Sequence, residues 1–181
     1  MNDAMSIVTR RGDRGQTVLM YNRFVSKCHP RVEACGAVDE LNAALGLARA
    51  AAKAGRLCQR LEVIQKDLVT LMGELATAAE DLPRYVKEGH TLVTPAMTAV
   101  LDGWIRELEA GPVAAKGWAM PGTNPASAAL DLARAVCRRA ERRACAVREA
   151  GQLNNAEIIV YLNRLSDWLW LLARRAETKR P

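Results

Sequence analysis

An arginine-rich stretch between Leu130 and Arg143 contains the residues best suited to chemistry, and it reads LDLARAVCRRAERR. At about 100° per residue on a helix, Arg134, Arg138 and Glu141 fall within about 60° of one another, beside the apolar stripe rather than opposite it. Guanidinium groups match phosphate oxygens through paired hydrogen bonds, so the stripe indicates a polyphosphate site. The alternative, which the pattern favours about equally, is a solvated charged face that Glu141 balances.

A second anion-binding segment is indicated near the N-terminus. Residues 9–17 read TRRGDRGQT, and Lys27 follows downstream. Gly12 and Gly15 would let backbone N–H groups approach an anion, while threonine hydroxyls and the lysine ammonium add donors. The segment matches neither a Walker A loop nor a dinucleotide fingerprint, so an ordinary surface turn is the alternative.

Four further polar residues outside these two segments are candidates for a functional role. Asp39 lies near the head of the first expected helix, where it would either favour the helix N-terminus or, as a half-buried acid, orient a guanidinium. Asn163 would share a helix face with an acid four residues later and form hydrogen bonds within or between helices. His29 and His90 fall in expected loops without metal-ligand spacing, so both are interpreted as surface histidines.

Helices must position these groups, because apolar residues recur at three- and four-residue spacing along most of the chain. Five helices are expected, from about Val32 to near Gly55, Leu57 to Leu75, Val93 to Leu108, Ala126 to Ala150, and Asn155 to Ala176. Asn124 would cap the fourth helix, with Pro125 following it. Residues 80–93 are expected to form a loop, and Ile7–Arg10 and Thr17–Met20 short extended pieces around the turn at 12–15.

The expected fold is all-α, an up-and-down five-helix bundle with an irregular N-terminal segment. We expect a single domain over 1–181, with an N-terminal segment at 1–31 and the bundle at 32–176. The 181 residues are 50% apolar and only 4% aromatic, which favours helices over a β-sandwich. No apolar run is long enough to cross a bilayer, and no secretory signal is visible.

The cysteine pattern and the net charge indicate which compartment and which partners to expect. Five cysteines without a C-x-x-C pair indicate free thiols in a reducing compartment, so a cytoplasmic protein is expected. The net charge of +6 would suit nucleic acid, but no recognition-helix motif or basic tail accompanies it. We therefore expect no nucleic-acid partner and no membrane association.

Together the segments form a pattern that resembles the PduO-type ATP:cob(I)alamin adenosyltransferases over nearly the whole chain. The matching segments are TRRGDRGQT at 9–17, VSK at 25–27, RVEACGAVDELN at 31–42, ARAVCRRAERR at 133–143 and YLNRLSD at 161–167. The resemblance implies a ferritin-like bundle that forms a homotrimer with active sites between subunits. It implies Mg-ATP and cob(I)alamin as substrates, with Co(I) attacking the 5′ carbon of ATP, so that adenosylcobalamin forms and triphosphate leaves.

The resemblance also implies residue roles. Arg134 would pair with Asp39 of the neighbouring subunit, Arg138 would act on the phosphates, and Trp118 would form the wall below the corrin. Magnesium would be carried by ATP, with Glu141 as its contact and no other direct protein ligand. The implied ATP-binding residues are Thr9, Arg10, Gly12, Asp13, Gly15, Thr17, Lys27, Arg138, Glu141 and Asn163. A flavoprotein reductase and an adenosylcobalamin-dependent enzyme would be partners.

Two segments depart from the family pattern. Residues 18–22 read VLMYN where a glycine pair is usual, and Trp118 stands where phenylalanine is common. These departures motivate the alternative of a non-catalytic carrier or sensor of adenosylcobalamin with the same fold.

Overall fold

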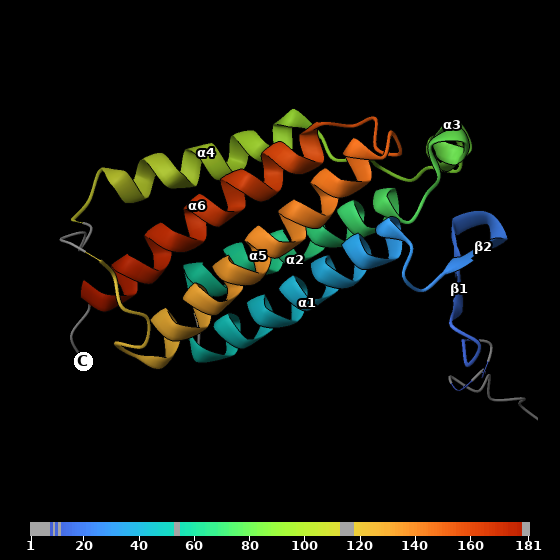
Figure 1. Cartoon of the computed structure of the whole chain (residues 1–181). Coiled ribbons are helices and arrows are strands. Elements are labelled where there is room, and N and C mark those ends of the chain that lie inside the picture. Colours follow the sequence, from blue (N-terminus) through green and yellow to red (C-terminus); the bar gives the residue numbers. More distant parts are fainter. Residues whose placement is uncertain (1–7, 9, 11, 53–54, 113–117, 179–181) are drawn as a thin grey trace, which may run out of the picture.

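The protein folds as a helical bundle in the computed structural model, which describes residues 8, 10, 12–52, 55–112 and 118–178. The described residues form five long helices, α1 (Pro30–Ala51), α2 (Arg56–Leu75), α4 (Pro95–Glu109), α5 (Pro125–Glu149) and α6 (Glu157–Thr178). They lie side by side along one axis (Figure 1). The all-α bundle expected from the sequence is confirmed.

α5 occupies the middle of the bundle, between α1 and α6, while α2 packs against α1 and α4 against α6. Small residues on α5 permit this close packing, since Ala133, Cys137, Ala140 and Ala144 are fully buried. The regular apolar spacing on α2 also lets this helix pack closely into the bundle. The residues of α2 that face the core are Leu61, Ile64, Leu68, Leu71 and Leu75.

Side chains at the helix starts satisfy backbone donors that the helices leave open. Asn124 caps α5 as predicted, accepting a hydrogen bond from the Ser127 N–H at 2.9 Å, while the Ser127 hydroxyl interacts with the Asn124 backbone. His29 caps α1, because its Nδ1 accepts a hydrogen bond from the Arg31 N–H at 3.2 Å. Its interpretation as an ordinary surface histidine was therefore wrong.

An antiparallel hairpin precedes the bundle, with β1 (Gln16–Leu19) paired to β2 (Arg23–Ser26) through a turn at Met20–Asn22. The predicted extended piece at 17–20 is confirmed in part, but β1 pairs with β2 rather than with a strand upstream of the turn at 12–15. Ile7 and Thr9 lie outside the described residues, and Val8 belongs to no strand. The hairpin contacts the bundle through the Met20 N–H, which donates to the Ala76 carbonyl at 3.0 Å.

A short helix, α3 (Leu82–Lys87), interrupts the stretch 80–93 that was predicted to be a loop. Pro83 lies in its first turn, where a missing N–H costs nothing. Tyr85 is 5% exposed and stacks on His90 with ring centroids 4.3 Å apart. Packing of this one aromatic residue stabilises a segment too short to show helical periodicity.

All five cysteines are free thiols, as predicted. Burial raises the pKa of Cys35 to about 11 and raises the pKa of Cys137 well above its ordinary value. These two thiols are therefore packing residues rather than nucleophiles. Among the residues that the structure describes, none of the helices has the length and apolarity required to cross a membrane.

Candidate functional site

The predicted polar stripe on α5 lies against the polar face of α6. The Asn163 side-chain amide on α6 donates to Glu141 Oε1 on α5 at 3.2 Å, so the fold brings these two candidate residues together. Arg138 is exposed one turn away, and Arg134 is half-buried. The Nε of Arg134 is buried without a hydrogen-bond partner among the described residues. This buried guanidinium donor is open to an acceptor from outside the chain.

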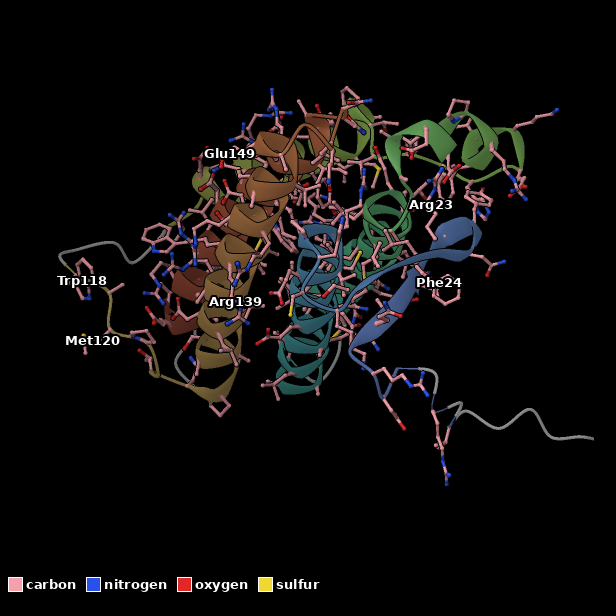
Figure 2. The ribbon with its side chains drawn as sticks, turned by 45° about the vertical axis from the view of Figure 1, so that its right-hand side comes forward. Arg23, Phe24, Trp118, Met120, Arg139 and Glu149 are labelled. Atoms are coloured by element: carbon pink, nitrogen blue, oxygen red, sulfur yellow. The ribbon has the colours of Figure 1, made fainter. Side chains whose placement is uncertain are left out.

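Two other arginines of α5 already have carboxylate partners on α1. Arg139, which Figure 2 labels on α5, forms an ion pair with Glu40. Arg143 lies 3.7 Å from Glu33. Both side chains remain about half exposed, and they also connect the two helices. Arg134 and Arg138 form no ion pair with any described residue, and Arg142 on the same helix does not either. Arg138 differs from Arg142 because it lies on the stripe of Glu141, whose carboxylate Asn163 holds.

Asp39 lies on α1 and is exposed, which corrects the expectation of a half-buried acid. Within the described part of the chain it forms no ion pair, and it does not contact Arg134. The side chain points away from the bundle because the buried face of α1 is formed by neighbours such as Ala37, Val38 and Leu41. The two candidate residues therefore remain unpaired within one chain.

At the N-terminal segment, the structure brings Lys27 against the two glycines of the turn. The Lys27 N–H donates to the Gly15 carbonyl at 2.9 Å. The lysine ammonium lies so close to Gly12 that a Cβ added there would be 2.9 Å from Nζ. Gly15 has φ +73°, a left-handed conformation that favours glycine. An ammonium held over a glycine turn is suited to binding a phosphate.

The remaining candidates of this segment surround the same turn. The Asp13 N–H donates to the Arg10 carbonyl at 3.3 Å, and both side chains are exposed. Thr17 is half-buried on β1 opposite Val25. Thr9 lies outside the described residues.

Trp118 lies far from this segment. Its side chain is 90% exposed on the stretch before α5, beside Met120, and Figure 2 shows both standing out from the bundle. The hairpin lies at the opposite end of the molecule (Figure 1). One chain therefore does not bring Trp118 and the candidate residues of the N-terminal segment together.

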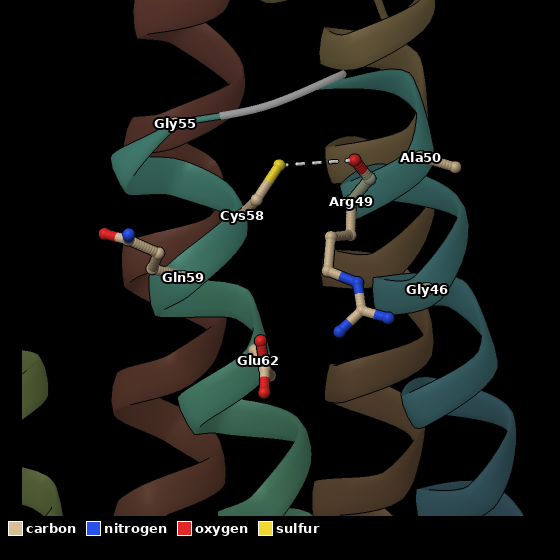
Figure 3. Close-up of a pocket in the computed structure, with 7 residues that line it drawn as sticks. All are labelled: Gly46, Arg49, Ala50, Gly55, Cys58, Gln59 and Glu62. Atoms are coloured by element: carbon tan, nitrogen blue, oxygen red, sulfur yellow. Dashed lines mark hydrogen bonds between the residues drawn. The ribbon is translucent and has the colours of Figure 1, made fainter.

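Two hollows in the described surface contain none of the residues expected to bind ATP or cobalamin. One, of about 620 Å³, lies between the end of α1 and the start of α2, where Cys58 Sγ is 3.5 Å from the Arg49 carbonyl (Figure 3). The other, of about 280 Å³, lies at the base of the hairpin beside Arg31. Arg31 is 4% exposed and donates to the Leu75 carbonyl at 2.7 Å. Burial lowers the pKa of this guanidinium, which has a structural role that the sequence did not reveal.

A resident metal cage is not indicated by the described residues, in which no three His, Cys, Asp or Glu side chains gather. A cation that a bound ligand carries needs fewer protein ligands than a resident metal ion does. Glu141 is half-buried and Asn163 holds one of its oxygens, so the carboxylate is oriented and suited to a single contact with Mg²⁺.

The sequence matches the family model described as "Cobalamin adenosyltransferase" over residues 7–176. The corrinoid adenosyltransferase PduO of Citrobacter freundii is 39% identical over 94% of this chain and 49% of its own length. The chain thus spans about half the length of such PduO relatives. A shorter corrinoid adenosyltransferase from Citrobacter freundii is 38% identical over 95% of both chains.

Solved structures show the same architecture. A variant of the PduO-type ATP:corrinoid adenosyltransferase from Lactobacillus reuteri, complexed with cobalamin and ATP, superposes with a TM-score of 0.83. It is 31% identical in sequence, and the match covers 96% of this chain and 94% of that one.

Proposed function

Because the chain belongs to the cobalamin adenosyltransferase family, we propose that it transfers the 5′-deoxyadenosyl group of ATP to cob(I)alamin. The electron pair of Co(I) attacks the 5′ carbon, the bond from that carbon to the phosphate oxygen breaks, and triphosphate leaves with the bonding pair. Adenosylcobalamin is the product. The observation that carries the proposal is Arg138, an exposed guanidinium without an ion pair among the described residues, beside the hydrogen-bonded Glu141 and Asn163.

The protein's task in this reaction is positioning and charge stabilisation, since the substrate supplies the nucleophile. Arg138 would bind the phosphates and stabilise the negative charge that develops on the leaving triphosphate. Asn163 would contact the nucleotide and orient Glu141 toward the Mg²⁺ that ATP carries. Lys27, above the Gly12 turn, would bind a phosphate oxygen, and Arg10, Asp13, Gly15, Thr17 and Thr9 would complete the N-terminal ATP-binding segment at 1–31.

We infer that complete sites form between subunits of a homotrimer. The hairpin and Trp118 lie at opposite ends of one chain, which supports a site built from two copies. Arg134 and Asp39 would then pair across the interface, which would supply the acceptor that the buried Arg134 Nε lacks. Trp118 would form the wall below the corrin.

Two further proposals concern the cellular compartment of the protein and its partners. Free thiols on all five cysteines support a reducing compartment, so we place the protein in the cytoplasm. A flavoprotein reductase would supply Co(I), and an adenosylcobalamin-dependent enzyme would receive the product. The bundle at 32–176 and the segment at 1–31 would act as one domain.

A single-turnover assay with ATP and chemically reduced cobalamin tests the proposal. We expect the parent to form a photolabile Co–C bond, and Arg138→Ala to slow its formation about 100- to 1000-fold while assembly is retained. Arg142→Ala is the matched control, since Arg142 is exposed on the same helix without an ion pair to a described residue. Parental turnover by Arg138→Ala would refute its role. Tight binding of adenosylcobalamin without any product would instead identify a carrier or sensor.

A further inference from the structure

Three charged side chains lie inside the bundle where α5 begins and α6 ends. Arg174 is 1% exposed and Asp131 is 7% exposed, and the Glu177 side chain is also largely covered. Arg174 Nη2 donates to Asp131 Oδ2 at 2.5 Å and lies 3.1 Å from Glu177 Oε1. One guanidinium thus holds a carboxylate from each helix.

The stretch that carries Trp118 is fastened to this ion cluster. The Thr123 hydroxyl donates to Glu177 Oε1 at 3.2 Å, the same oxygen that faces Arg174. The Asn124 side-chain amide donates to the Ala176 carbonyl at 3.0 Å. Residues 118–124 therefore end in two hydrogen bonds to the last turns of α6, while Trp118 projects at the other end of the stretch (Figure 2).

Stability of the bundle does not account for the cluster. Apolar residues of similar volume in place of a buried ion pair are often neutral or stabilising, because burying the ions carries a desolvation penalty. Buried ions differ from apolar residues because their interactions are directional. Each buried carboxylate oxygen must accept a hydrogen bond from a donor in a defined position. Glu177 is held by Arg174 and in turn holds Thr123, so the ions determine where the stretch leaves the bundle.

We propose that Asp131, Arg174 and Glu177 are positioning residues that set the place of residues 118–124 and, through Trp118, the fit of the corrin substrate. This inference rests on the proposed function. It separates corrin fit from ATP binding, because the cluster is hydrogen-bonded to the stretch that carries Trp118 and, among the described residues, forms no hydrogen bond or ion pair with the segment that carries Lys27.

Glu177→Gln and Thr123→Val test the proposal. The first replaces the charged acceptor of Thr123 and Arg174 with a neutral one, the second removes the Thr123 hydroxyl, and both leave the Arg174–Asp131 pair in place. Loss of a hydrogen bond to a charged group corresponds to about a tenfold change, so we expect the KM for cobalamin to rise about tenfold in both variants. The KM for ATP and the melting temperature should stay at parental values. Glu157→Gln is the matched control, since it neutralises the acceptor of a Thr98–Glu157 contact of the same kind at the other end of α6.

A double-mutant cycle with Trp118→Ala separates positioning from general support of the fold. If the cluster acts through Trp118, Glu177→Gln should have no further effect on the cobalamin KM in the Trp118→Ala background. Additive effects, a parental cobalamin KM in Glu177→Gln, or equal changes in both KM values would overturn the inference. If the parent forms no product, the proposed function fails, and spectral titration of the same variants with cob(II)alamin still measures corrin fit.

Discussion

Gly12 leaves room for the Lys27 ammonium, and replacing it with alanine should weaken ATP binding without unfolding the protein. A Cβ at Gly12 would lie 2.9 Å from Lys27 Nζ and 3.0 Å from Lys27 Cε. Non-bonded contacts this short are not sustained, so the amine must swing away. The φ of Gly12 lies outside the left-handed region and Lys27 is exposed, so neither the backbone nor the packing opposes the change.

The size of the effect follows from the contact that is lost. A hydrogen bond from the ammonium to a phosphate oxygen contributes about 1.5–3 kcal/mol, which corresponds to a rise of about 10- to 150-fold in the KM for ATP. The KM for cobalamin at saturating ATP should not change, because the proposed contact of Lys27 is to the phosphates of ATP and not to the corrin. Initial rates with varied ATP measure the first effect, and thermal unfolding followed by circular dichroism checks the fold.

Two further variants make the reasoning refutable. Gly103→Ala on α4 is the control, because nothing lies within 4 Å of an added Cβ there. It should keep the parental KM and gain up to about 1 kcal/mol in stability. Lys27→Ala should raise the KM for ATP as Gly12→Ala does, and the double variant should rise no further. A parental KM in Gly12→Ala, or additive effects in the double variant, would show that Lys27 does not bind the phosphates.

Three other predictions concern the fold. Glu74→Ala should lower the free energy of unfolding by about 3–5 kcal/mol in chemical denaturation, because the buried carboxylate accepts hydrogen bonds from the buried Val93 N–H and from the half-buried Asn155 amide. Exposed Glu62→Ala should cost under about 0.5 kcal/mol. At pH 8 an alkylating reagent should label exposed Cys28 but not Cys35, whose pKa of about 11 leaves about one thiol in a thousand ionised; equal labelling in the native protein, read by mass spectrometry, would contradict this. Burial raises the pKa of Asp67, so the folded state binds the Asp67 proton more tightly than the unfolded state does. The stability of the parent relative to Asp67→Asn should therefore fall as pH rises through that raised pKa. Melting curves in which this difference in stability is independent of pH would refute the prediction.

The long helices could be predicted from the sequence because each repeats its apolar spacing over several turns. The arginine stripe of α5 could be predicted for the same reason. α3 could not, since six residues show no period and its stability depends on the packing of Tyr85 against His90 and against Gly73 of α2. The turn of the hairpin was hidden because Tyr21 and Asn22 adopt φ near +60° where glycine is the usual signal.

Some features of the candidate site could not be inferred from spacing. Asp39 and Arg134 were recognised as related residues through family resemblance, while their exposure depends on which face of each helix the bundle leaves open. The buried cluster around Arg174 gave no signal. Glu177 is one helical turn from Arg174, but Asp131 is 43 residues away in sequence, and only the packing of α5 against α6 brings it to Arg174. Contacts of this separation are determined by tertiary structure alone.

A subunit-mixing experiment tests most directly the claim that one site is built from two copies of this chain. Lys27→Ala and Arg138→Ala each place one defect in every site of their own assembly. If the two residues meet across an interface, unfolding and refolding a 1:1 mixture should restore adenosyl transfer at about a quarter of the parental rate, because one site in four receives both intact residues. If both residues of a site came from one chain, the mixture would be no more active than its components, and that result would contradict the account.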